Sequence, residues 1–143
     1  MRRHPICLLL AAYLVVGCAH SGPPVPPDIA DLLARLERDP IAPGEAVRIT
    51  KLVESPDMSG LLVQVRGSLP PHFHKLTQEV VYMLSGEGLL QLDADRIPIK
   101  AGAVVRIPAG RVHTFTNQGH APAVFFVVTT PRWDEQDRFM VKD

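Results

Sequence analysis

The 143-residue sequence has no excess of either charge and few aromatic side chains. Basic and acidic residues number 15 each, so the formal net charge is zero, and aromatic residues make up 6% of the chain. Nucleic-acid-binding proteins usually gather lysine and arginine on one face, and no basic block occurs here. An internal repeat, a phosphate-binding glycine loop and a nucleophile elbow are also absent. We therefore expect no nucleic-acid partner.

No apolar run in the chain is long enough for a transmembrane helix. After the positive residues 1–4, the apolar run 6–16 spans 11 residues, well short of the roughly 20 that a membrane crossing needs. This pattern is typical of a secretory signal. It ends in Val-Val-Gly-Cys18, which resembles the bacterial lipobox, where cleavage precedes a lipidated cysteine. We expect residues 1–17 to be a lipoprotein signal peptide, with an ordinary signal peptide or a weak anchor as alternatives.

Cysteine is scarce, because the chain holds only Cys7 and Cys18. Removal of the signal would take Cys7, and lipid would occupy Cys18, so the mature chain would have neither a free thiol nor a disulfide. Residues 18–27 contain four prolines and are expected to form an extended tether; a proline-rich ligand for a partner domain is the alternative. Resemblance to bacterial lipoproteins, with Ala19 after the cysteine, implies attachment by the lipid to the periplasmic face of the outer membrane, if the organism has one.

The remaining residues, 28–143, fit one small domain. A short N-terminal helix is predicted over 28–39, with Asp28 as N-cap and Pro40 ending it. Its apolar side chains share one face and comprise Ile29, Leu32, Leu33 and Leu36. From residue 46 the pattern changes to short β-branched segments separated by turn residues. The predicted strands cover residues 47–53, 61–66, 79–84, 88–92, 96–99, 103–107, 112–116 and 123–129.

Eight short strands at this spacing favour an all-β jelly roll or closed barrel. Residues 85–87 and 93–95 are predicted as hairpin turns. Residues 133–143 are polar with scattered apolar positions, and the pattern leaves them undecided between a short helix and a tail.

The segment around His72 contains side chains of the types that bind metals. Side chains two apart on a strand share a face, so His72 and His74 project side by side while Phe73 points away. Four residues separate His74 from Glu79, enough to cross a turn and return the carboxylate on the next strand. Two imidazoles and a carboxylate can hold a divalent metal and leave coordination positions open. The spacing therefore predicts a metal site inside the barrel.

Two stretches resemble the paired motifs of the cupin superfamily. The first, HxH-x4-E-x6-G, is filled by His72, His74, Glu79 and Gly86, although Gly67 precedes it at a spacing one residue shorter than the family pattern. The second motif, G-x5-P-x-G-x2-H-x3-N, is filled by a later set of residues: Gly102, Pro108, Gly110, His113 and Asn117. The motif core spans residues 46–130.

The resemblance implies a small cupin-like jelly-roll barrel that holds one divalent transition metal on His72, His74, Glu79 and His113. Three imidazoles and a carboxylate suit Zn, Mn, Fe, Ni or Cu. An exported protein would take its metal outside the cytoplasm, where Fe(II) is oxidised more readily, and this favours Zn or Mn. The motif glycines, Pro108 and Asn117 are expected to shape turns.

Strand parity predicts the lining of the pocket. If Glu79 and His113 point inward, so do Val81, Met83 and Phe115, which gives an apolar lining without an arginine to clamp an anion. Two function classes remain open. One is a metal-dependent enzyme, an oxidoreductase (dioxygenase-like) or isomerase, acting on a small molecule. The other is a non-catalytic binding or sensory module of the periplasm. The lack of an additional acid or base in the lining mildly favours either this class or redox chemistry at the metal.

The outward face of the 79–84 strand is also apolar, because Val80, Tyr82 and Leu84 lie on it. Such a face is normally covered. We expect either the 28–39 helix or a second copy of the chain to cover it, the latter giving a homodimer.

Overall fold

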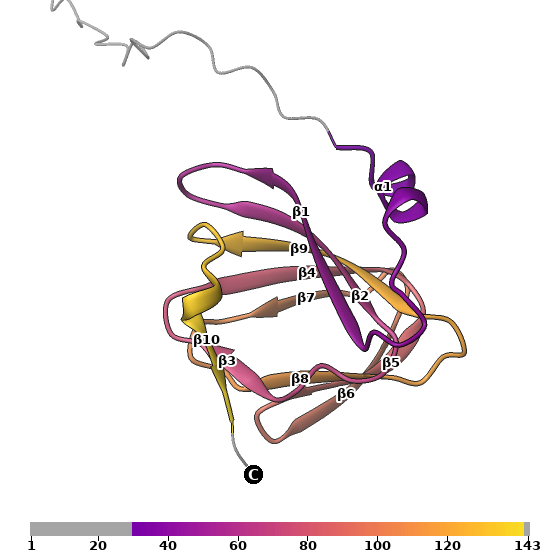
Figure 1. The fold of residues 1–143 in the computed structure, drawn as a ribbon. Helices are drawn as coiled ribbons and strands as arrows, with labels where there is room; N and C mark the ends of the chain where they lie inside the picture. The colour runs from indigo at the N-terminus through magenta and orange to yellow at the C-terminus, as the bar shows by residue number, and fades with distance from the viewer. Residues whose placement is uncertain (1–29, 142–143) are drawn as a thin grey trace, which may run out of the picture.

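The computed structural model describes residues 30–141 (Figure 1). The expected signal peptide, Cys18 and the proline-rich tether lie outside the described residues. Within 30–141, no helix is long and apolar enough to cross a membrane.

Two five-stranded antiparallel sheets face each other and form the all-β, jelly-roll-like barrel that the sequence predicts (Figure 1). The first sheet has the order β1-β2-β9-β4-β7. Its strands are β1 (Val47–Glu54), β2 (Ser59–Val65), β9 (Ala123–Thr130), β4 (Gln78–Ser85) and β7 (Val104–Ile107). The second sheet has the order β10-β3-β8-β5-β6. Its strands are β10 (Arg138–Met140), β3 (His72–His74), β8 (His113–Asn117), β5 (Glu87–Leu92) and β6 (Asp95–Lys100).

All eight predicted strands are confirmed to within two residues at each end. The turn at 93–95 joins β5 and β6 as a hairpin, with Asp93 at a φ of 51°. The hairpin predicted at 85–87 is wrong, because β4 and β5 belong to different sheets and do not pair. Gly86, at a φ of 92°, instead turns the chain from one sheet to the other. A side chain there would place its Cβ 2.9 Å from the Cα of Ala123.

The core lies between the sheets and follows strand parity. On β4, Met83 is fully buried and Val81 packs against the core, while Val80 and Tyr82 are exposed, as predicted. Phe115 on β8 and Phe125 on β9 meet edge to face across the barrel, with ring centroids 4.8 Å apart. The other buried members of this cluster are Leu61, Val63, Val65, Leu90, Ala123, Val127 and Trp133.

The single described α-helix, α1 (Leu32–Arg38), is shorter than predicted. Asp31, not Asp28, is its N-cap, and the Asp31 carboxylate accepts a hydrogen bond from the Ala34 N–H at 2.9 Å. No residue of α1 is buried, and Leu33 is 72% exposed. The helix therefore does not cover Val80 and Tyr82.

The C-terminal segment, which the sequence pattern leaves undecided, forms a short 3₁₀ helix followed by a strand. A 3₁₀ turn, η1 (Glu135–Asp137), leads into β10, which pairs with β3 at the edge of the second sheet. Figure 1 shows β10 running beside β3 at one mouth of the barrel. This segment places residues 133–138 next to the histidines.

Candidate metal centre

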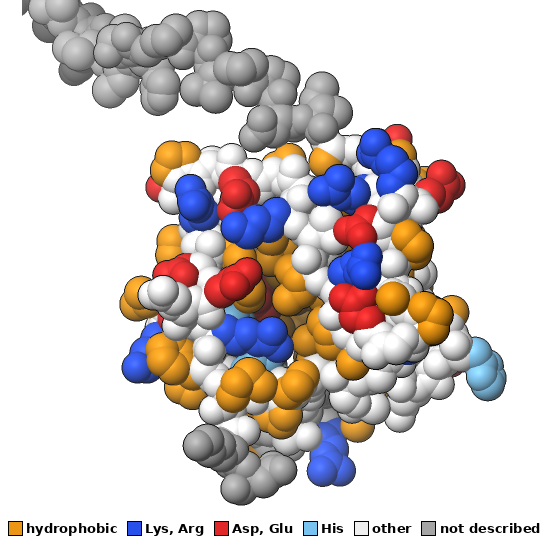
Figure 2. Space-filling model, in the orientation of Figure 1, with side chains coloured by type: hydrophobic (Ala, Val, Ile, Leu, Met, Phe, Trp, Pro, Cys, Tyr) orange, Lys and Arg blue, Asp and Glu red, His pale blue; other side chains and the backbone are white. Residues whose placement is uncertain are grey.

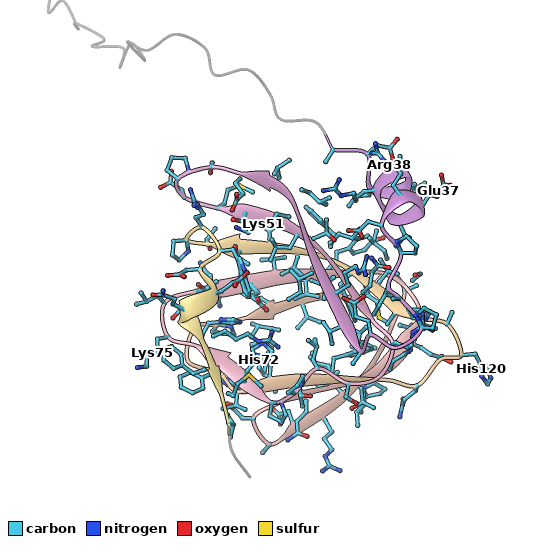
Figure 3. The ribbon with its side chains drawn as sticks, in the orientation of Figure 1. Glu37, Arg38, Lys51, His72, Lys75 and His120 are labelled. Carbon is cyan, nitrogen blue, oxygen red and sulfur yellow. The ribbon has the colours of Figure 1, made fainter. Side chains whose placement is uncertain are left out.

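Three histidines and a glutamate converge at one end of the barrel interior. His72 and His74 lie on β3, and His113 on β8 is the direct pairing partner of His72. One ring nitrogen of each of the three imidazoles lies within 4.8 Å of the corresponding nitrogens of the other two. Glu79 reaches them from the opposite sheet, with its carboxylate oxygens 3.5 Å from Nε2 of His74 and 3.5 Å from Nε2 of His113. All four side chains are buried. In Figure 3, His72 lies inside the barrel, while Lys75 and His120 lie at its periphery.

Backbone carbonyls fix the orientation of all three rings. The Nδ1 atoms of His72, His74 and His113 lie 2.8, 3.0 and 3.1 Å from the carbonyl oxygens of Pro70, Asp137 and Arg111 respectively. A carbonyl oxygen only accepts, so each Nδ1 carries the proton and donates it. Each Nε2 is then left with a free lone pair, which is the arrangement of metal-binding histidines oriented by an outer hydrogen bond.

One buried nitrogen of the cluster lacks a hydrogen-bond partner among the described residues. This atom is Nε2 of His74. An orphaned buried acceptor is costly. Together with the facing Glu79 oxygens, it marks a place where a cation would satisfy several lone pairs at once. The donor set present therefore fits a divalent transition metal.

Burial controls the protonation of the cluster. It lowers the pKa of His72 to about 3 and that of His113 to about 4, and it also lowers the pKa of His74. Burial raises the pKa of the Glu79 carboxyl to about 7. At neutral pH the imidazoles are thus neutral and ready to donate lone pairs, while Glu79 is poised between its acid and its carboxylate.

Asp137 supports this arrangement from the C-terminal segment. Besides its main-chain bond to His74, its carboxylate accepts hydrogen bonds from the N–H groups of Lys75, Leu76 and Thr77, at 2.9, 3.1 and 2.9 Å. These three residues form the turn between β3 and β4, which separates His74 from Glu79. Asp137 therefore fixes the spacing of two candidate ligands.

A cavity of about 70 Å³, counted as the space open to the centre of a water molecule, adjoins the cluster. Figure 2 shows the hollow at this face, with hydrophobic and histidine atoms visible inside and charged side chains around it. His72, Glu79 and His113 line its polar part. Its walls are mainly aliphatic and aromatic and include Leu61, Val63, Val81, Leu90, Val105, Phe115, Phe125, Val127 and Trp133.

Arg138 also lines this cavity, and the expectation of a lining without an arginine is therefore wrong. Trp133 likewise belongs to the site, with its ring edge-on to His74 at a centroid distance of 5.4 Å. Both residues come from the C-terminal segment. The position of Arg138 depends on β10 pairing with β3, and the N–H of Trp133 donates to Oγ of Ser59 on β2 at 3.0 Å. No local pattern in the segment reveals these long-range contacts.

The remaining residues of the two motifs lie in turns or at the end of a strand. Gly110, at a φ of 82°, donates its N–H to the carbonyl of His74 at 2.6 Å, two residues after Pro108. Gly102, at a φ of 92°, precedes β7. Asn117 donates to the carbonyls of Arg66 and Ala121 at 3.2 and 2.8 Å. His120, which is exposed, does not join the cluster.

Comparison with known proteins places this geometry in a family. The Cupin domain family matches residues 61–129. An uncharacterized protein of Aquifex aeolicus is 31% identical over 98 residues, which make up 68% of this chain and 80% of that protein. The chain belongs to the cupin superfamily.

Further cupin relatives are known by function or structure. The oxalate-binding protein of Thermotoga maritima is 35% identical over 69 residues, covering 44% of this chain and 57% of that protein. The crystal structure of TT1209 from Thermus thermophilus matches with a TM-score of 0.64 at 28% identity, and covers 74% of this cupin and 99% of TT1209.

Proposed function

We propose that this cupin binds one divalent transition metal through His72, His74, Glu79 and His113, and that the adjoining cavity presents a small molecule to it. The observation that carries the proposal is the set of three Nδ1–H groups tied to backbone carbonyls, which leaves Nε2 free on each of the three clustered imidazoles, two of them 3.5 Å from a Glu79 oxygen. Zn, Mn, Fe, Ni and Cu all suit this donor set. Metal analysis of the purified protein and of its histidine variants tests the proposal.

The chemistry we propose is that of a metal-dependent oxidoreductase or isomerase acting on a small substrate. A metal held here would act as a Lewis acid or a redox centre for a bound ligand. The protein contributes a buried apolar enclosure, which limits water and orients the substrate beside the four side chains. The Thermotoga relative, whose name is that of an oxalate-binding protein, supports a small-molecule ligand.

One observation favours the alternative, a non-catalytic binding or sensory module. Beyond the four candidate ligands, the only titratable residue that lines the cavity in the described chain is Arg138, and an arginine stays protonated and is a poor general base. Two measurements on the metal-loaded protein distinguish an enzyme from a binding module. Oxygen uptake, or exchange of a substrate proton for deuterium in D₂O, indicates turnover, whereas ligand binding without either indicates a binding module.

We further propose that the cupin is held at the cell envelope by lipid on Cys18. The support is the signal-like residues 1–17 followed by the lipobox-like Val-Val-Gly-Cys18 sequence. Expression of the full chain in a bacterium fed an alkyne-labelled fatty acid tests it. Label in the wild type but not in Cys18→Ala supports the anchor, and label in neither contradicts it.

A further inference from the structure

Arg138 lies on the edge strand of the second sheet, β10, next to the candidate metal ligands. It pairs directly with His74 in the β10–β3 ladder, and directly opposed residues of neighbouring strands project on the same face. The next pair along the ladder, Phe139 and Phe73, stacks on the other face with ring centroids 5.3 Å apart. Parity therefore directs the Arg138 side chain into the cavity, which it lines together with His72 and His113.

The guanidinium has no fixed partner within the described chain. Its Nε is buried without a hydrogen-bond partner, and no carboxylate of the described residues lies within ion-pairing distance of the group. Glu79 is the only acidic residue that lines the cavity. A metal on the four ligands would engage that carboxylate, and the positive charges of the metal and Arg138 would then exceed the single negative charge of Glu79. A half-buried arginine in this position would be stabilised by a bound anion.

The rest of the cavity restricts the kind of anion. Its walls are aliphatic and aromatic, so most of a ligand's surface there would be apolar. A single guanidinium offers two parallel N–H donors, which match a carboxylate in a bidentate manner. Phosphate and a dicarboxylate such as oxalate have no apolar part to bury against these walls.

We propose that Arg138 binds the carboxylate of a small monocarboxylic acid whose apolar body lies against the aliphatic wall of the cavity, beside His72 and His113. This inference rests on the proposed function, since it assigns the ligand class of the same site. It makes Arg138 a specificity-determining residue whose contribution depends on the ligand's charge.

Trp133 provides a direct readout, because it is the only tryptophan of the chain and lines the cavity. We would titrate the full chain, purified in detergent and loaded with Zn, while recording tryptophan fluorescence. The probes are 4-methylpentanoate, its neutral amide 4-methylpentanamide, oxalate and inorganic phosphate. We expect 4-methylpentanoate to bind at least about tenfold more tightly than the amide, a difference equal to ~1.4 kcal/mol, and more tightly than oxalate or phosphate.

Arg138→Gln tests the assignment to this residue. It should remove most of the preference for the acid over the amide while retaining bound Zn, because the four metal ligands remain. Arg138→Lys keeps the positive charge but lacks the two parallel N–H donors of the guanidinium. It should retain part of the preference for the acid over the amide. The matched control is Arg132→Gln, which removes the same charge from an exposed side chain nearby, 59% accessible and outside the cavity lining; it should leave both affinities unchanged.

The outcomes separate this inference from the proposed function. Equal binding of acid and amide by the wild type, or an unchanged preference in Arg138→Gln with Zn retained, would overturn the role of Arg138. Tighter binding of oxalate or phosphate than of 4-methylpentanoate would overturn the apolar monocarboxylate class. A wild type that holds no metal while Arg138 still selects the acid would overturn the metal site and leave this inference standing. If Arg138→Gln fails to fold, the Arg138→Lys variant and the wild-type acid–amide comparison decide.

Discussion

The main-chain oxygen of Asp137 accepts a hydrogen bond from Nδ1 of His74, 3.0 Å away and 63 residues earlier in the sequence. Through this bond, η1 leaves Nε2 of His74 facing the carboxylate of Glu79. The Asp137 carboxylate simultaneously holds the turn that leads to Glu79. One residue thus supports two candidate ligands that lie on different sheets.

Replacement of Asp137 by alanine should destabilise the fold and loosen the site. The N–H groups of Lys75, Leu76 and Thr77 would lose a charged acceptor, and bonds to charged groups are the strong ones. We expect the free energy of unfolding to fall by about 2–4 kcal/mol, measured by urea denaturation with Trp133 fluorescence. The control is Asp134→Asn. Asp134 is the N-cap of η1, where its carboxylate accepts from the Gln136 N–H at 2.9 Å, and asparagine caps as well as aspartate. Equal stability of Asp137→Ala and wild type would show that these bonds contribute little.

Metal affinity should depend on pH mainly through the proton of Glu79. Burial holds His72 and His113 at pKa values of about 3 and about 4, so both are neutral above pH 5, whereas Glu79 has a pKa of about 7 in the metal-free protein. A metal must displace the Glu79 proton below that value. We expect the affinity to rise about tenfold per pH unit between roughly pH 5 and 7 and then to level off.

Chelator competition at several pH values measures this slope. Glu79→Gln should bind the metal more weakly and lose most of the pH dependence over the same range. A wild-type slope of two or three protons per metal would mean instead that the histidines are protonated in the metal-free protein.

Gly88 on β5 should tolerate no side chain. A Cβ at this buried position would lie 2.3 Å from the carbonyl oxygen of Thr116 and 2.4 Å from Cζ of Phe115. We expect Gly88→Ala to reduce the free energy of unfolding by about 1–3 kcal/mol, as overpacking does. Gly67→Ala, with nothing within 4 Å of the added Cβ, is the matched control. Similar unfolding midpoints for the two variants would contradict the close packing of β5 on β8.

A homodimer through the outer face of the first sheet remains a proposal. Tyr82 on β4 pairs with Val104 on β7, and with Val80 they leave apolar side chains 41%, 67% and 44% exposed. We expect light scattering on a soluble form beginning at Ala19 to give twice the chain mass, and Val104→Glu to give the monomer. Ile97→Glu, on the other sheet, should leave the dimer intact. A wild type that is strictly monomeric rules the dimer out.

Local sequence patterns were sufficient to predict the positions of most of the strands. Alternating β-branched residues located eight of them because one face of each strand is buried in the barrel. The same parity placed Val81, Met83 and Phe115 inside. Spacing singled out His72, His74 and Glu79, whereas His113 was identified through the motif resemblance, and the structure brings all four together.

The errors arose where long-range pairing decides the structure. A glycine turn such as Gly86 has the same local signal whether it closes a hairpin or sends the chain to another sheet. Residues 138–140 form too short a strand to show a period, and they are a strand only because β3 is available to pair with them. Arg138 and Trp133 therefore reached the cavity unpredicted.

Metal content tests the central claim most directly. A soluble form beginning at Ala19 would be loaded in turn with Mn, Zn, Fe(II), Ni and Cu, desalted and analysed by mass spectrometry beside His72→Ala and His113→Ala. His120→Ala, an exposed histidine outside the cluster, is the control. We predict about one equivalent of a single metal in wild type and control, as a set of four protein ligands would hold, and its loss from both cluster variants. An empty wild type with every metal, or cluster variants that retain the metal, would contradict the account.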